Sequence, residues 1–175
     1  MSLAYLPEHA ENARLALELA IREATHLAYT HRTLYAQSID LPWVEALSHR
    51  DDLSEKIDAY VRRFGRLQDH IGEKLIPRFA SLMGENTKTM LDTLAFAEKM
   101  GWIENAESFF GARKLRNLLI HEYLSDPALF LEALKAADHA TQMLSATVDA
   151  ITTYAEDIRL AQDSRSKPRT FDHHE

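Results

Sequence analysis

The chain of 175 residues contains no cysteine, so disulfide bonds, thiolate nucleophiles and thiolate metal ligands are all excluded. Glycine and proline are also scarce, with 5 of each, whereas alanine, leucine and glutamate are abundant. This composition favours helices throughout the chain. No stretch shows the alternation of apolar and polar residues that is typical of strands. We therefore expect an all-α protein.

Two further absences concern the location of the protein. No apolar run approaches the ~20 residues that a membrane-spanning helix needs. The first residues, Met1 to Glu8, lack the basic segment and the apolar core of a signal peptide. These features predict a cytoplasmic protein that does not bind membranes.

The formal net charge of −7 counts against broad, non-specific binding of nucleic acid, because proteins that coat RNA or DNA usually have a basic surface. A small basic pocket is compatible with an acidic total, since the local arrangement of charges decides what binds there.

Apolar residues recur at intervals of three and four along most of the chain, which is typical of amphipathic helices. This pattern and the residues at helix ends predict helices over about residues 7–36, 52–83, 87–100 and 127–159, with a further helical segment after Asn105. Asp40 is the expected N-cap of an additional short helix. We expect an up-and-down bundle of four to five helices in a single domain of residues 1–160. The tail, residues 161–175, is polar and aperiodic and is expected to be disordered.

The second predicted helix contains three residues that disturb helices. Pro77 should bend it about one turn earlier, because proline lacks an N–H and clashes with the preceding turn. Gly65 and Gly72 are seven positions apart and so share one face. They either allow close contact with a neighbouring helix or simply lower the stability, and the sequence leaves both interpretations open.

The most informative residues are Arg116 to Tyr123, which read Arg-Asn-Leu-Leu-Ile-His-Glu-Tyr. On an ideal helix Arg116 and Tyr123 share one face, and Asn117 and His121 share another. Glu122 would lie among leucines on the core side, where an unpaired carboxylate is costly. We therefore expect the helix to unwind or bend near His121, so that Arg116 and His121 converge on one concave site.

This pattern suits RNA cleavage without a metal ion. RNA supplies its own nucleophile, the 2′-hydroxyl, so an enzyme needs a base, an acid and a cation for the phosphorane. His121 is the expected base or acid, Arg116 the expected phosphate clamp, and Asn117 a polar neighbour that orients His121 or binds phosphate. Because one histidine cannot be base and acid at once, a two-fold homodimer with two copies of each residue is attractive.

The Arg-x4-His-x-Tyr pattern resembles the signature of HEPN-domain proteins of the HepT toxin type, which are helical ribonucleases paired with a nucleotidyltransferase antitoxin. The resemblance is sharp over Arg113 to Tyr123 and only architectural elsewhere, since the long helices and the tail depart from the family. It implies metal-independent cleavage by Arg116 and His121 at a dimer interface. It also implies that the antitoxin silences the toxin by adenylylating Tyr123.

Two basic runs are candidate RNA-binding residues. One lies on the second predicted helix and the other precedes the motif: Arg62, Arg63 and Arg66, and Arg113 and Lys114. Arg116 itself continues the second run. If the bundle places both runs on one rim, they form a local RNA groove, whereas a single run of this kind is more often a solvated helix face.

The nine histidines have no spacing typical of a metal site, and neither a glycine-rich phosphate loop nor a serine nucleophile motif is present. We therefore expect no metal ion and no cofactor.

Other functions remain open. The chain is alternatively a non-catalytic, helical substrate-binding subunit of a two-part nucleotidyltransferase, or a structural interaction bundle. In both cases Arg116 would serve only in surface ion pairs, for example with Glu122, and the spacing of Arg116 and His121 would be left unexplained.

Overall fold

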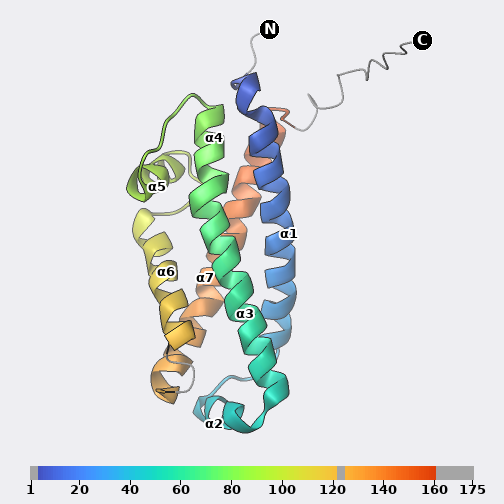
Figure 1. Ribbon diagram of the computed structural model, residues 1–175, viewed down its shortest axis with the longest axis vertical. Coiled ribbons are helices and arrows are strands. Elements are labelled where there is room, and N and C mark those ends of the chain that lie inside the picture. Colours follow the sequence, from blue (N-terminus) through green and yellow to red (C-terminus); the bar gives the residue numbers. More distant parts are fainter. Residues whose placement is uncertain (1–3, 122–124, 161–175) are drawn as a thin grey trace, which may run out of the picture.

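The computed structural model describes residues 4–121 and 125–160, and these residues form a helical bundle without a strand. The long helices α1 (Ala10–Leu34), α3 (Asp51–His70), α6 (Ala106–His121) and α7 (Pro127–Asp157) run along its longest axis. The shorter helices are α2 (Leu41–Glu45), α4 (Ile76–Leu82) and α5 (Met90–Lys99), with 3₁₀ turns η1 (Pro7–His9) and η2 (Ala46–His49). Figure 1 shows α2 at one end of the bundle and α5 towards the other. The prediction of an all-α bundle is confirmed. The predicted disorder of residues 161–175 lies outside the described residues.

Several helix ends are set by the capping residues that the sequence predicts. The Asp40 carboxylate accepts a hydrogen bond from the Trp43 amide at 2.9 Å, and Asp126 accepts one from the Leu129 amide at 3.1 Å. These bonds satisfy amides that lack partners in the first turn. The third predicted helix is wrong at its start: it begins at Met90 rather than near residue 87, because Thr89 forms a capping box with Asp92.

The second predicted helix is continuous but changes its winding in the middle. Between α3 and α4 lies a π-helical turn, η3 (Ile71–Leu75), which ends two residues before Pro77. In a regular α-helix the Pro77 ring would clash with the carbonyl of Glu73, and the wider π turn relieves that contact. The change in winding thus lies where the sequence predicted an effect of Pro77, whereas the predicted bend itself stays a prediction.

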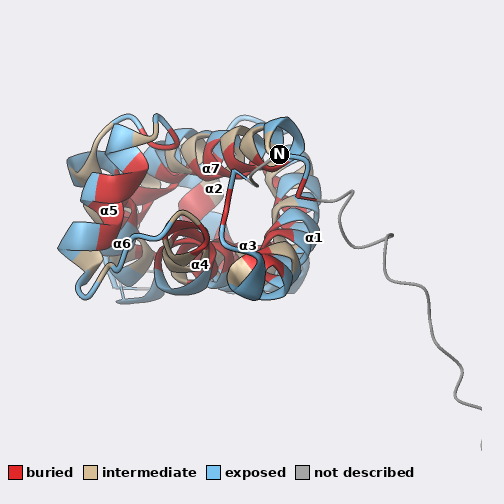
Figure 2. Ribbon diagram, turned by 90° about the horizontal axis from the view of Figure 1, so that it is seen from above, coloured by how far each residue is buried: buried red, intermediate tan, exposed pale blue. Residues whose placement is uncertain are grey.

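The core lies between α1, α3, α6 and α7, and Figure 2 shows the buried residues on the inward faces of these helices. Its largest fully buried side chains are aromatic: Tyr60, Phe64, Phe79 and Phe130. Gly72 of η3 also faces inwards, because a Cβ atom there would lie 3.1 Å from Met90 and 3.2 Å from Phe109. Gly72 thus allows close contact with α5 and α6. Of the two interpretations of this glycine, close contact between helices is therefore the correct one. Among the residues that the structure describes, no helix is long and apolar enough to span a bilayer.

Candidate functional site

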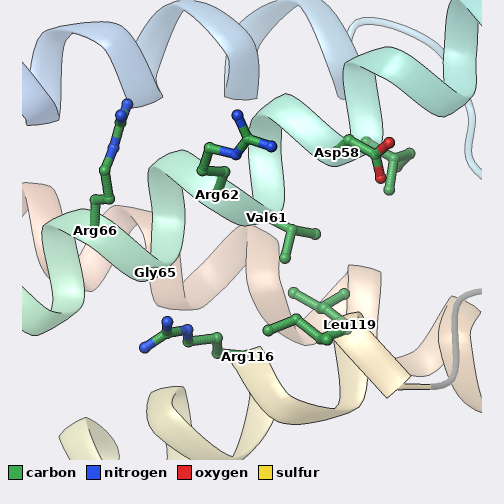
Figure 3. Close-up of a pocket in the computed structure, with 9 residues that line it drawn as sticks. Asp58, Val61, Arg62, Gly65, Arg66, Arg116 and Leu119 are labelled. Atoms are coloured by element: carbon green, nitrogen blue, oxygen red, sulfur yellow. The ribbon is translucent and has the colours of Figure 1, made fainter.

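A groove of about 500 Å³ separates α3 from α6. Figure 3 shows it in close-up, with arginines from both helices along its sides. Its lining consists of Ile57, Asp58, Val61, Arg62, Gly65, Arg66, Arg116, Leu119 and Ile120. The α3 residues recur at intervals of three and four, which places them on the one face of that helix that is turned towards α6.

Arg116 is held in this groove by a carboxylate of the opposite helix. Its Nη1 atom donates to both carboxylate oxygens of Asp69, at 2.8 and 2.7 Å. About a third of each side chain is exposed, so the pair is accessible to a ligand from solvent. The Nε and Nη2 donors of the guanidinium are not used by Asp69, and they remain available for a further acceptor.

Gly65 makes room for Arg116. A Cβ atom at position 65 would lie 2.7 Å from Nε and 3.1 Å from Cζ of Arg116, so the guanidinium crosses α3 where that helix has no side chain. Gly65 and Asp69 are one turn apart on α3, and together they determine where the charge of Arg116 lies. Gly65, like Gly72, therefore allows close contact between neighbouring helices, here between α3 and the Arg116 side chain of α6.

The other arginines of α3 divide between two faces. Arg66 lines the groove, and its Nε lies 3.4 Å from a carboxylate oxygen of Glu23 on α1. Arg62 is exposed in the groove and has no ion pair among the described residues. Arg63 instead turns to α1, where it donates to the carbonyl of His26 at 3.1 Å and to the Thr30 hydroxyl. The predicted basic run therefore supplies two groove residues, and Arg63 fastens α3 to α1.

The remaining residues predicted from the motif lie outside this groove. Arg113, Asn117 and His121 are exposed on α6 and do not line it, and Lys114 borders a second hollow between α6 and α7. Figure 1 shows that α6 runs beside α3, with α7 behind them. The two predicted basic runs therefore meet only through Arg116, which completes the arginine cluster begun by the α3 residues.

The structure does not bring Arg116 and His121 into one pocket within a chain. Helix α6 is regular through His121, so the two residues remain about 140° apart around the helix and roughly 7.5 Å apart along it. The helix ends at His121, whose carbonyl accepts a hydrogen bond from the Ser125 hydroxyl. The expected convergence of Arg116 and His121 is therefore not found, whereas unwinding just beyond His121 stays a prediction. Glu122 and Tyr123 lie outside the described residues.

Three carboxylates were not identified as functional from the sequence: Asp58, which lines the groove, and Asp69 and Glu23, which pair with its arginines. A signal was present for two of them, because Asp58, Arg62 and Asp69 share a helical face with Gly65. The ion pair with Glu23 depends on how α1 packs on α3, and spacing within one helix cannot indicate that.

Among residues 4–121 and 125–160, no group of three or more histidine, aspartate or glutamate side chains is arranged to hold a metal ion. The chain matches no protein-family model, no curated protein and no solved structure in the comparisons made.

Proposed function

We propose that the protein is a HEPN-like, metal-independent ribonuclease that works as a homodimer, with Arg116 and His121 as its catalytic residues. One observation carries the proposal: Arg116, the arginine of the Arg-x4-His-x-Tyr pattern, is oriented by Asp69 in an accessible groove together with Arg62 and Arg66. Arg66 and Arg116 are already paired with carboxylates, so the capacity to bind an anion rests on the unpaired Arg62 and on the Arg116 donors that Asp69 leaves free.

The outer face of α6 extends this surface. Arg113, Asn117 and His121 lie within about 80° of one another around the helix, and all three are exposed. An RNA strand that crosses α6 would meet positive or neutral polar side chains between the groove and His121. Phosphate contacts of this kind position a strand without reading its sequence.

The chemistry follows from the residue types. The 2′-oxygen bonds to phosphorus as one His121 removes its proton, and the bond from phosphorus to the 5′-oxygen breaks as a second His121 protonates the leaving oxygen. Arg116 stabilises the negative charge of the phosphorane through the donors that Asp69 leaves free. The products are a 2′,3′-cyclic phosphate and a 5′-hydroxyl.

A second copy of the chain supplies what one copy lacks. Since Arg116 and His121 diverge around α6, a phosphate held by Arg116 of one protomer is reached more directly by His121 of its partner. Ile120 is 50% exposed between these two residues, and it offers an apolar contact for such an interface.

The regulatory part of the proposal rests on the resemblance alone. A partner nucleotidyltransferase would transfer an adenylyl group to Tyr123, two residues after His121, and so block the site. Tyr123→Phe should retain cleavage and escape this modification, and intact mass after incubation with the partner and ATP measures the outcome.

One observation favours a second candidate, the non-catalytic binding subunit. Arg116 already has a carboxylate partner, and in a single chain it is separated from His121, so the groove is equally able to hold an anionic ligand without cleaving it.

Cleavage of bulk tRNA and mRNA in EDTA distinguishes the two candidates. The wild type and His49→Ala, which replaces an exposed histidine far from α6 in the sequence, should both cleave. His121→Ala should not cleave, although its helicity is unchanged. Absence of cleavage by the wild type, once intact mass has excluded an adenylyl group, would favour the binding subunit.

A further inference from the structure

The groove between α3 and α6 has two chemically different ends. Figure 3 shows Arg66 and Arg116 towards one end and Asp58 at the other. The surface between them is apolar and is formed by Ile57, Val61, Leu119 and Ile120. A ligand that fills the groove therefore needs an anionic end, a flat or apolar middle, and hydrogen-bond donors at its far end.

The anionic end is suited to a single phosphate. Arg116 lies at this end (Figure 3) and keeps donors that Asp69 does not use. Guanidinium groups bind phosphate oxygens through paired donors, and they do so more specifically than a lysine would.

Asp58 defines the opposite end. It is exposed at the margin of the apolar surface and makes no hydrogen bond or ion pair with residues 4–121 or 125–160. Arg62 lies one turn further along α3 and forms no ion pair with Asp58. An ionised carboxylate can only accept hydrogen bonds, so Asp58 selects a ligand with two adjacent donors.

We propose that this groove binds a guanine nucleotide of single-stranded RNA, with its phosphate at Arg116 and the Watson–Crick edge of guanine at Asp58. Guanine presents adjacent N1–H and N2–H donors, which match the two oxygens of one carboxylate. Adenine and cytosine offer a single amino group, and the N3–H of uracil stands between two carbonyl oxygens that Asp58 would repel. A volume of about 500 Å³ falls within the usual range for small-ligand sites.

Apolar contact explains why the base must be unpaired. The groove covers the face of the base with Val61 and Ile120, and the Watson–Crick edge is free for Asp58 only outside a duplex. The inference rests on the proposed function for its substrate and adds the base that the enzyme reads. Cleavage should therefore occur beside unpaired guanines.

Calorimetric titration of the full chain with 5′-mononucleotides tests the site without requiring cleavage. GMP should bind at least about fivefold more tightly than AMP, CMP or UMP, the usual size of discrimination by a paired contact to a base edge. Inosine monophosphate, which lacks the N2 amino group, should bind between GMP and AMP. Arg116→Ala should weaken all of these ligands to a similar extent.

Asp58→Asn is the decisive variant, because an amide has one acceptor and one donor and cannot match both guanine donors. It should abolish the preference for GMP and strengthen the binding of UMP, because the amide can accept from the N3–H of uracil and donate to a neighbouring carbonyl. Glu55→Gln is the matched control: it also removes an exposed carboxylate from α3, but outside the groove, and the preference should persist. Circular dichroism establishes that each variant is folded.

Equal binding of the four nucleotides by the wild type, no binding of any of them, or an unchanged preference in Asp58→Asn would overturn this inference. The ribonuclease proposal fails separately. An Asp58-dependent preference for GMP in a protein that cleaves no RNA would support the site and contradict the ribonuclease. His121-dependent cleavage without a preference for guanine would support the ribonuclease and contradict the guanine site.

Discussion

Arg116 shows how a single side chain is oriented from two directions. Asp69 draws its guanidinium along α3 by charge, and the missing side chain of Gly65 lets it lie against the helix backbone. A partly exposed ion pair contributes little to stability, typically no more than about 1 kcal/mol. The arrangement therefore serves orientation more than folding, as expected for a group that must meet a phosphate in a fixed position.

Gly65→Ala tests this role of the glycine. The new methyl group would occupy the space of the Arg116 Nε, so the guanidinium must shift, whereas the helix backbone need not. Cleavage should fall by roughly tenfold to a hundredfold, the scale of a misplacement of about 1 Å. Steady-state cleavage of an RNA oligonucleotide measures the effect.

Gly111→Ala on α6 is the matched control, because no atom lies within 4 Å of the added Cβ. It should leave cleavage unchanged and raise the stability by about 0.5–1 kcal/mol, since alanine is the better helix former. Equal cleavage by both alanine variants would show that Gly65 does not position Arg116.

At the scale of the helices, the sequence determines the local features and leaves the contacts between helices open. The caps Asp40 and Asp126 and the position of the disturbance before Pro77 were predicted correctly because each depends on residues within one turn. The ion pair of Asp69 and Arg116 joins residues 47 positions apart, so it arises only once α3 and α6 are packed. The regular course of α6 as far as His121 leaves Arg116 and His121 on different faces, contrary to the expectation that they converge.

Tyr60 provides a test of how α3 packs on α7. Its hydroxyl donates to the Ala137 carbonyl at 3.0 Å and lies 2.6 Å from the Thr141 hydroxyl, and burial raises its pKa to about 12. An unfolded chain exposes a tyrosine of pKa ~10. As the pH rises from ~10 to about 12, the unfolded chain loses this proton while the folded chain keeps it, so stability falls.

Tyr60→Phe should therefore make the alkaline loss of unfolding free energy smaller by roughly 2–3 kcal/mol over that range. At neutral pH the same variant should be about 1–2 kcal/mol less stable than the wild type, because Thr141 loses a buried hydrogen-bond partner. Urea unfolding at several pH values gives both quantities. Parallel stability curves for the two proteins would contradict the assigned burial of Tyr60.

At the scale of the whole molecule, one chain presents Arg116 and His121 in different directions, and the proposed chemistry requires a second chain. Ile120→Asp places a charge between these residues, at the proposed interface. We expect this variant to be monomeric by analytical ultracentrifugation at concentrations at which the wild type is a dimer, and to have lost RNA cleavage. Because Ile120 also lines the groove, lost cleavage by a variant that is still dimeric would reflect the groove and not the interface. The control is Leu91→Asp, which alters an apolar residue on α5 that is 63% exposed. RNA cleavage by a monomer of the wild type or of Ile120→Asp would show that the site is complete within one chain.

The most direct measurement identifies the ends of the cleavage products. An RNA oligonucleotide is incubated in EDTA with the wild type, with Arg116→Ala or with His121→Ala, and the products are analysed by mass spectrometry. If the protein is the proposed ribonuclease, we expect 2′,3′-cyclic phosphate and 5′-hydroxyl ends from the wild type and no products from either variant. Products with 3′-hydroxyl and 5′-phosphate ends, or undiminished cleavage by the variants, would contradict it.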